Sequence, residues 1–134
     1  MAQESISPDE AQRLRELKGA SRTTRTFEIL ADTGVLWVWG DDDDTLFMQD
    51  ADGTGVLPVW PYAALARVEC EGAASGEHPI DVAVDRFIEV WLPQIEDDKM
   101  GVAVFPVNGR IAVTLTAAEF RSKIAAARRA RGPA

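Results

Sequence analysis

Apolar residues recur along the chain at two spacings, which predict both helices and strands. The longest stripe at three- and four-residue spacing runs from Asp81 to about Glu96 and indicates an amphipathic helix. Its apolar positions are Val84, Phe87, Ile88, Trp91, Leu92 and Ile95. Pro93 lies inside this stripe, and we expect it to kink the helix or to end its regular part near Trp91.

Three dense β-forming runs, at residues 35–39, 45–49 and 56–60, predict an antiparallel meander. The four aspartates Asp41–Asp44 separate the first two runs and favour a solvated turn, because four adjacent like charges do not fit a buried position. Pro58 has no N–H to donate, so it must lie at a sheet edge or at a strand end.

A second strand unit is a hairpin. Asn108-Gly109 is the strongest short hairpin signal in the chain, and it predicts that residues 101–105 and 111–115 pair as antiparallel strands. Between the two units, residues 62–67 indicate a short helix, and the small and polar residues 71–79 indicate a loop.

Capping signals predict where helices begin at both ends of the chain. Ser7 and Glu10 form a capping box for a first helix, and residues 23–31 are typical of a second one. Thr116 and Glu119 form the same box at the start of the last helix.

Together these elements predict one domain with an α+β fold, in which helices pack on an antiparallel sheet of about five strands, a three-strand meander and a hairpin. We expect residues 1–26 to form an N-terminal helical extension, residues 27–127 the α+β core, and residues 128–134 a basic tail that frays.

Charge is distributed unevenly along the chain. The 134 residues carry a net charge of −8, but residues 1–26 sum to +1, residues 27–106 to −14 and residues 107–134 to +5. A body this negative repels phosphate backbones, so we expect no nucleic-acid binding through it. It attracts basic proteins, although solubility alone is the commoner reason for acidity.

The apolar runs are far shorter than the about 20 residues that span a bilayer, and the N-terminus lacks an apolar signal segment. We therefore expect a cytoplasmic protein that does not bind membranes. The single cysteine, Cys70, agrees with this compartment and is expected to be a buried thiol.

The residue types needed for catalysis are sparse. The single histidine, His78, excludes mechanisms and metal sites that need two histidines, and solvated carboxylates lack the burial that tunes a pKa for acid–base work. Asp50–Gly53 resembles part of a calcium loop, but Met48 and Val59 stand where ligands would be required, so a plain turn is favoured. We expect no enzymatic activity, cofactor or metal.

The four tryptophans offer the best candidates for binding. Trp37 and Trp91 are expected in the core, and Trp91 should be largely buried beside Phe87. Trp39, next to the aspartates, and Trp60, between two prolines, are expected at a partly exposed rim, where an aromatic ring beside carboxylates suits a partner's arginine or lysine. The candidate binding residues are Trp39, Asp41, Asp42, Asp43, Asp44 and Trp60.

Four motifs stand out along the chain: Trp37 followed by acidic residues, Leu57-Pro58-Val59-Trp60-Pro61 with Ala63 and Ala66, Phe87-Ile88 with Trp91-Leu92-Pro93, and Val104-Phe105-Pro106. Together they resemble a small bacterial family of unknown function, domain family 2750 (DUF2750). The resemblance covers about Phe27 to Phe120. It implies a shared fold but no activity, because the recurrent residues are apolar.

Two functions remain open. The first is a non-enzymatic interaction protein that binds a basic partner through the acidic-aromatic surface, as small acidic proteins do when they neutralise basic toxins. The second is a small-molecule-binding or catalytic domain with a pocket between the sheet and the long helix. The pattern does not predict an oligomeric state.

Overall fold

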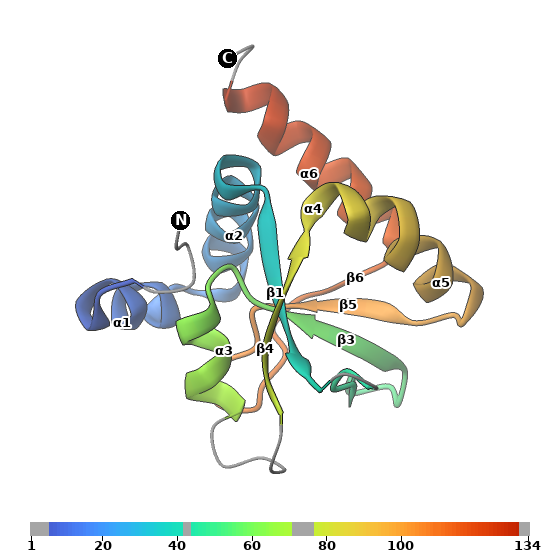
Figure 1. Cartoon of the computed structure of the whole chain (residues 1–134), viewed down its shortest axis with the longest axis horizontal. Coiled ribbons are helices and arrows are strands. Elements are labelled where there is room, and N and C mark those ends of the chain that lie inside the picture. The colour runs from blue at the N-terminus through green and yellow to red at the C-terminus, as the bar shows by residue number, and fades with distance from the viewer. Residues whose placement is uncertain (1–5, 42–43, 71–76, 132–134) are drawn as a thin grey trace.

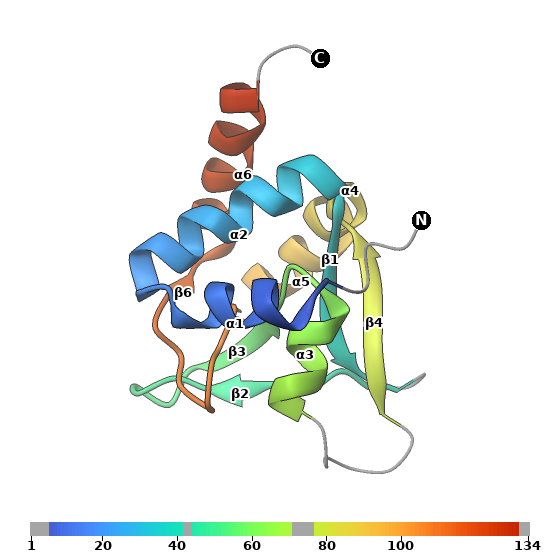
Figure 2. The same cartoon turned by 90° about the vertical axis from the view of Figure 1, so that its left-hand side faces the viewer.

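A two-stranded and a four-stranded sheet lie at the centre of the molecule, with helices on both sides (Figure 1). The computed structural model describes residues 6–41, 44–70 and 77–131 and confirms the α+β class. The helices are α1 (Pro8–Glu16), α2 (Gly19–Thr33), α3 (Ala63–Cys70), α4 (Val84–Arg86), the π-helix η1 (Phe87–Trp91), α5 (Leu92–Asp97) and α6 (Ala117–Arg131). The strands are β1 (Val35–Gly40), β2 (Met48–Gln49), β3 (Gly55–Val59), β4 (His78–Ala83), β5 (Gly101–Val104) and β6 (Thr114–Leu115). Helices α1, α2 and α3 lie on one side of β1, and α4, α5 and α6 lie on the other (Figures 1 and 2).

The strand pairing differs from the expected meander. β2 and β3 form the antiparallel hairpin as predicted, but β1 pairs along its whole length with β4 and meets β3 only at a bridge between Trp37 and Trp60. β3 then pairs in parallel with β5, so the four-stranded sheet β2-β3-β5-β6 is mixed rather than antiparallel. The parallel pair joins segments that are far apart in the sequence, so no local turn signal can predict this pairing.

Strand β4 occupies a segment predicted as loop and helix. Its residues alternate in burial, with Val82 buried between the exposed Asp81 and Ala83, which is the pattern of a half-covered strand. The strand forms a two-stranded sheet with β1 and lies at its outer edge (Figure 2), where Pro79 is tolerated. The long helix therefore begins at Val84 rather than at Asp81.

Pro93 is accommodated by a change of helix type. The residues from Phe87 to Trp91 form a π-helix, in which the N–H of Leu92 donates to the carbonyl of Phe87, and α5 continues to Asp97 with Pro93 in its first turn. The sequence predicted a kink or the end of the regular helix near Trp91. The irregular part instead precedes Pro93, and regular α-helix resumes at Leu92.

The Asn108-Gly109 hairpin is confirmed, although its strands are shorter than expected. Both turn residues have positive φ, 55° and 74°, and a bridge between Val107 and Arg110 closes the turn. The ladder is interrupted because Phe105 adopts a φ of 50° and donates its N–H to Val59 across the sheet.

Both predicted N-caps are present, and the second forms a complete capping box. Ser7 Oγ accepts from the N–H of Glu10 at 3.1 Å, and Thr116 and Glu119 exchange two bonds of 2.8 and 3.1 Å. Helix α6 projects beyond the sheet (Figure 2) and reaches Arg131, inside the segment assigned to a fraying tail. Arg131 forms an ion pair with Asp32 at 2.6 Å.

Three aromatic rings anchor the helices over the sheet. The ring of Phe120 on α6 lies 5.0 Å from that of Phe27 on α2 and 5.0 Å from that of Phe87 on the π-helix. All three side chains are at most 3% exposed. This cluster fixes the long helix, and with it the side chains that the helix presents at its outer face.

Candidate functional site

The two tryptophans assigned to an exposed rim are buried, which corrects that prediction. Trp39 is 6% exposed and its Nε1 donates to Glu77 Oε1 at 3.1 Å. Trp60 is 1% exposed and its Nε1 donates to the Pro106 carbonyl oxygen at 3.2 Å. Burial is possible because each indole N–H finds an acceptor, so the ring enters the core without an unpaired donor. Neither ring can receive a partner's cation.

The two tryptophans assigned to the core are less buried than those two. Trp37 and Trp91 are both of intermediate exposure, although Phe87 beside Trp91 is fully buried. The ring centroids of Phe87 and Trp91 are 5.8 Å apart, so Trp91 packs on the core and remains partly exposed. The Nε1 of Trp37 is buried and has no hydrogen-bond partner within the described part of the chain.

The aspartate run begins as a tight loop over Gly40. Asp41 Oδ1 accepts from the N–H of Asp44 at 2.9 Å, and the N–H of Asp41 donates to the Asp44 carbonyl oxygen at 2.9 Å. A Cβ on Gly40 would meet that same carbonyl oxygen and would lie 2.7 Å from Thr45 Cα. Asp44 is exposed, and Asp42 and Asp43 lie outside the described residues. Asp41 therefore shapes the turn in addition to carrying charge.

A groove opens between β3, the segment before β2, and the long helix. Phe47 and Val90, 50% and 49% exposed, stand at this groove and are two of the three exposed large hydrophobic residues in the described segments. The cavity measures about 250 Å³. Its lining residues are Phe47, Leu57, Val90, Trp91, Gln94, Ile95, Asp98 and Met100. An exposed apolar patch with a hollow in it is the usual mark of a contact surface.

One carboxylate lies in this apolar groove. Asp98 accepts two hydrogen bonds from the Gln94 amide, each 3.2 Å long, and both residues are exposed. Trp91, Gln94 and Asp98 follow one another at helical spacing, so they form one row along the helix face. The groove therefore combines an aromatic ring, an amide and a negative charge.

Sequence reasoning missed the groove residues, although a signal was present. Val90 is not one of the residues of the apolar stripe of the long helix. Because the stripe faces the core, an apolar residue on another face of the helix is exposed. Phe47 lies in a predicted strand, and nothing local distinguishes a strand phenylalanine that is exposed from one that is buried. Only the packing of the helix against β3 brings the two together.

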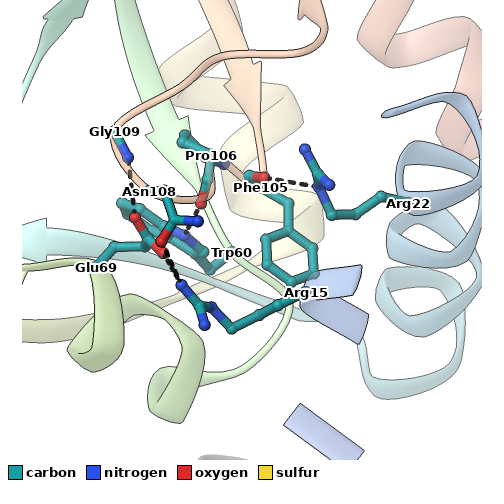
Figure 3. Close-up of polar contacts among 8 residues, drawn as sticks. All are labelled: Arg15, Arg22, Trp60, Glu69, Phe105, Pro106, Asn108 and Gly109. Atoms are coloured by element: carbon teal, nitrogen blue, oxygen red, sulfur yellow. Dashed lines mark hydrogen bonds and ion pairs between the residues drawn. The ribbon is translucent and has the colours of Figure 1, made fainter. Parts of the chain in front are cut away.

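A second polar cluster, between α1, α2, α3 and the hairpin turn, is structural (Figure 3). Arg15 pairs with Glu69 Oε2 at 3.0 Å and donates to Asn108 Oδ1 at 2.9 Å, while Glu69 Oε1 accepts from the N–H of Gly109. These contacts hold the Asn108-Gly109 turn against α1 and α3. The hydrogen bonds and the ion pair drawn in Figure 3 each join two different segments of the chain.

The corner at Phe105 is held from the opposite side by Arg22. The guanidinium of Arg22, 8% exposed, donates to the Phe105 carbonyl oxygen at 3.1 Å and to the Leu17 carbonyl oxygen at 2.6 Å, and lies 5.5 Å from the Phe105 ring centroid. Burial lowers the pKa of Arg22, and the nearby Glu69 opposes this shift. The positive φ of Phe105 persists because these contacts fix both its carbonyl and its ring.

Two further reactive side chains, Cys70 and His78, lie outside the groove. Cys70 is 8% exposed, and burial, followed by the charges of Glu69 and Glu77, raises the pKa of its thiol to about 11. His78 is exposed and its Nδ1 contacts the Pro79 carbonyl oxygen. Within the described residues, no group of three or more potential ligands could hold a metal ion, and no helix is long and apolar enough to cross a membrane.

The Asp50–Gly53 segment is a turn of the β2–β3 hairpin. Asp50 Oδ1 accepts from the N–H groups of Asp52 and Thr54 at 2.9 and 3.0 Å. The side chain thus replaces backbone bonds in the turn, which is the ordinary role of aspartate at such a position.

Fold and motifs together define an α+β protein whose recognisable sequence pattern is architectural: Trp60 bonds Pro106, and Phe87 packs on Trp91. The chain belongs to the family described as Protein of unknown function (DUF2750), whose model matches residues 23–124. This confirms the resemblance inferred from the motifs. No curated protein and no solved structure shows significant similarity to the chain.

Proposed function

We propose that this protein is a non-enzymatic interaction module that binds a basic protein through the groove and the acidic surface beside it. The observation that carries the proposal is that Phe47 and Val90 line one hollow although both are about half exposed. Leaving two large apolar side chains in water at one place is costly unless a partner covers them.

Charge decides the kind of partner. The groove lies in residues 27–106, whose side chains sum to −14, and it contains the carboxylate of Asp98. A field of this sign accelerates the encounter with a cationic protein and disfavours acidic ones. An immunity-like or inhibitor-like role, in which carboxylates cover a cationic active site, agrees with this field.

The buried tryptophans change which residues supply the anchor. Trp39 and Trp60 are in the core, so the aromatic part of the surface is provided by Phe47 and Trp91 instead. The aspartate run contributes negative charge near Phe47, because the exposed Asp44 precedes Phe47 by three residues. The acidic part of the predicted surface is kept in this proposal, and its aromatic part is replaced.

A small-molecule site is the second candidate, because the groove lies between β3 and the long helix, where that alternative predicted a pocket. Ligand pockets in proteins usually measure about 300–1,000 Å³ and enclose most of the ligand. A cavity of about 250 Å³ that is open to solvent fits a side chain from a partner better than a complete metabolite.

The test compares two exposed apolar residues of equal exposure. A partner is recovered by affinity capture from the native host and purified, and its binding kinetics are measured against Phe47→Ser and Val68→Ser. Phe47 lines the groove, whereas Val68, 52% exposed on α3, does not. Phe47→Ser should raise the Kd about tenfold through faster dissociation, because an anchor acts after docking. Val68→Ser should bind as the unmodified protein does.

A charge variant tests the steering component separately. Replacing Asp41–Asp44 with asparagine keeps the side-chain acceptor that closes the Gly40 loop and should leave folding intact. It should slow association and flatten its dependence on salt. If Phe47→Ser and Val68→Ser bind alike and the asparagine variant associates at an unaltered rate, the proposal is wrong.

A further inference from the structure

We infer that the groove recognises an arginine next to an apolar residue in the partner, with the arginine on the row Trp91–Gln94–Asp98 and the apolar side chain in the hollow beside it. This inference rests on the proposed function, and it names the chemistry that the groove selects.

The apolar half of the recognition follows from the lining. Leu57 and Ile95, 1% and 5% exposed, form the deep part of the hollow, and Phe47 and Val90 stand at its rim. Met100 completes the wall, and its flexible thioether can adapt to different apolar side chains. The volume of about 250 Å³ limits the occupant to a single side chain of a longer chain.

The cationic half follows from the row on the helix. Asp98 provides a carboxylate, and Trp91 provides an indole ring on the same face of the helix. A guanidinium is planar, can bind a carboxylate through two N–H groups and can stack on an aromatic ring, whereas a lysine ammonium forms only point contacts. A ring and a carboxylate in one row of the helix face, with the Gln94 amide between them, therefore favour arginine over lysine.

The end of the helix supports the same sign of charge. Asp98 is the C-cap residue of α5, which continues η1, and the carbonyl groups of a helix C-terminus carry partial negative charge. Asp97, one position earlier, is also exposed, whereas Glu96 lies 3.8 Å from Arg121. Lys99 follows Asp98 with a φ of 56° and makes no ion pair within the described residues. The carboxylate of Asp98 thus has only the Gln94 amide as a partner there.

The experiment uses defined peptides as probes, so it does not depend on the natural partner. Acetylated and amidated Gly-Ser-Arg-Leu-Ser-Gly is titrated into the ¹⁵N-labelled protein and followed by amide and indole chemical shifts. Three control peptides are matched to it. In the first the arginine is replaced by citrulline, which has the same shape without the charge, in the second the arginine is replaced by lysine, and in the third the leucine is replaced by serine. The arginine peptide should bind about five- to tenfold more tightly than the citrulline peptide, and the shifts should map to Trp91, Ile95 and Asp98.

Two protein variants locate the selectivity. Asp98→Asn should remove the preference for arginine over citrulline, while Asp97→Asn, a neighbouring exposed carboxylate outside the lining, should keep it. Equal binding of the arginine and citrulline peptides, shifts that map elsewhere, or no saturable shift with any peptide would overturn the inference. If no peptide binds as expected but Phe47→Ser still weakens binding to the purified partner, only the arginine recognition is wrong, and the interaction function stands.

Discussion

The indole N–H of Trp60 offers the sharpest test of whether this residue belongs to the core or to a binding surface. In Trp60→Phe the ring remains aromatic, but the donor that reaches the buried Pro106 carbonyl oxygen at 3.2 Å is lost. The substitution leaves a buried acceptor without this partner, which costs about 1–3 kcal/mol of unfolding free energy. For a chain of this length that corresponds to a fall in Tm of about 4–12 °C.

Trp37 provides the matched control, because it pairs with Trp60 across the bridge between β1 and β3. Its Nε1 is buried without a partner in the described segments, so Trp37→Phe removes an unsatisfied donor rather than a hydrogen bond. The relief of that penalty offsets the loss of ring area, and the unfolding free energy should change by less than about 1 kcal/mol.

Urea unfolding followed by far-ultraviolet circular dichroism measures both variants, since fluorescence would itself change with the tryptophans. Trp60→Phe should be the less stable of the two by about 1 kcal/mol or more. It should bind the partner with unaltered kinetics once folded, because the ring is only 1% exposed. Equal stabilities, or weaker partner binding by a fully folded Trp60→Phe, would refute the assignment of Trp60 to the core.

Two further predictions follow from Gly40 and Cys70. Gly40→Ala should lower the free energy of unfolding in urea by at least about 2 kcal/mol, because its Cβ would meet backbone atoms of Asp44 and Thr45. It should destabilise the protein more than the control Gly53→Ala, whose Cβ would meet nothing within 4 Å and whose only disadvantage is a φ of 83°. The reverse order of stabilities would contradict the loop geometry. The thiol of Cys70 has its pKa raised by burial from 9.0 to about 11, so its neutral form stabilises the fold fully below pH 9, and this contribution is lost as the pH rises through 11. The difference in unfolding free energy between the unmodified protein and Cys70→Ala should therefore shrink from pH 9 to pH 11, and a constant difference would show that the thiol is solvated.

The architectural motif explains why the family is recognisable from its sequence. Trp60 and Pro106 are joined by a hydrogen bond, and Pro58 lies in β3 between the segments paired with β2 and with β1. Arg15 and Arg22, which brace the hairpin turn and the Phe105 corner, precede the matched residues 23–124. Part of the support for the shared fold in this chain therefore comes from outside the shared segment.

Elements whose causes are local could be predicted from the sequence. The Ser7 N-cap, the Thr116 capping box and the Asn108-Gly109 turn formed as expected, because each depends on a few adjacent residues whose side chains and dihedral angles decide the outcome. The apolar stripe likewise predicted a helix whose Phe87 and Leu92 are fully buried. The acidic character of the body is fixed by composition alone.

Tertiary contacts decided the strand order, the fate of the tryptophans and the groove. β4 has a weak local pattern and becomes a strand because β1 offers a full-length partner. Trp39 and Trp60 are buried because Glu77 and Pro106, distant in the sequence, accept their N–H groups. Phe47 and Val90 meet at one hollow only after the long helix has packed beside β3. Local sequence determines which backbone conformations have low free energy. The pairing of acceptors, strands and helix faces that are distant in the sequence determines which side chains stay exposed for a partner.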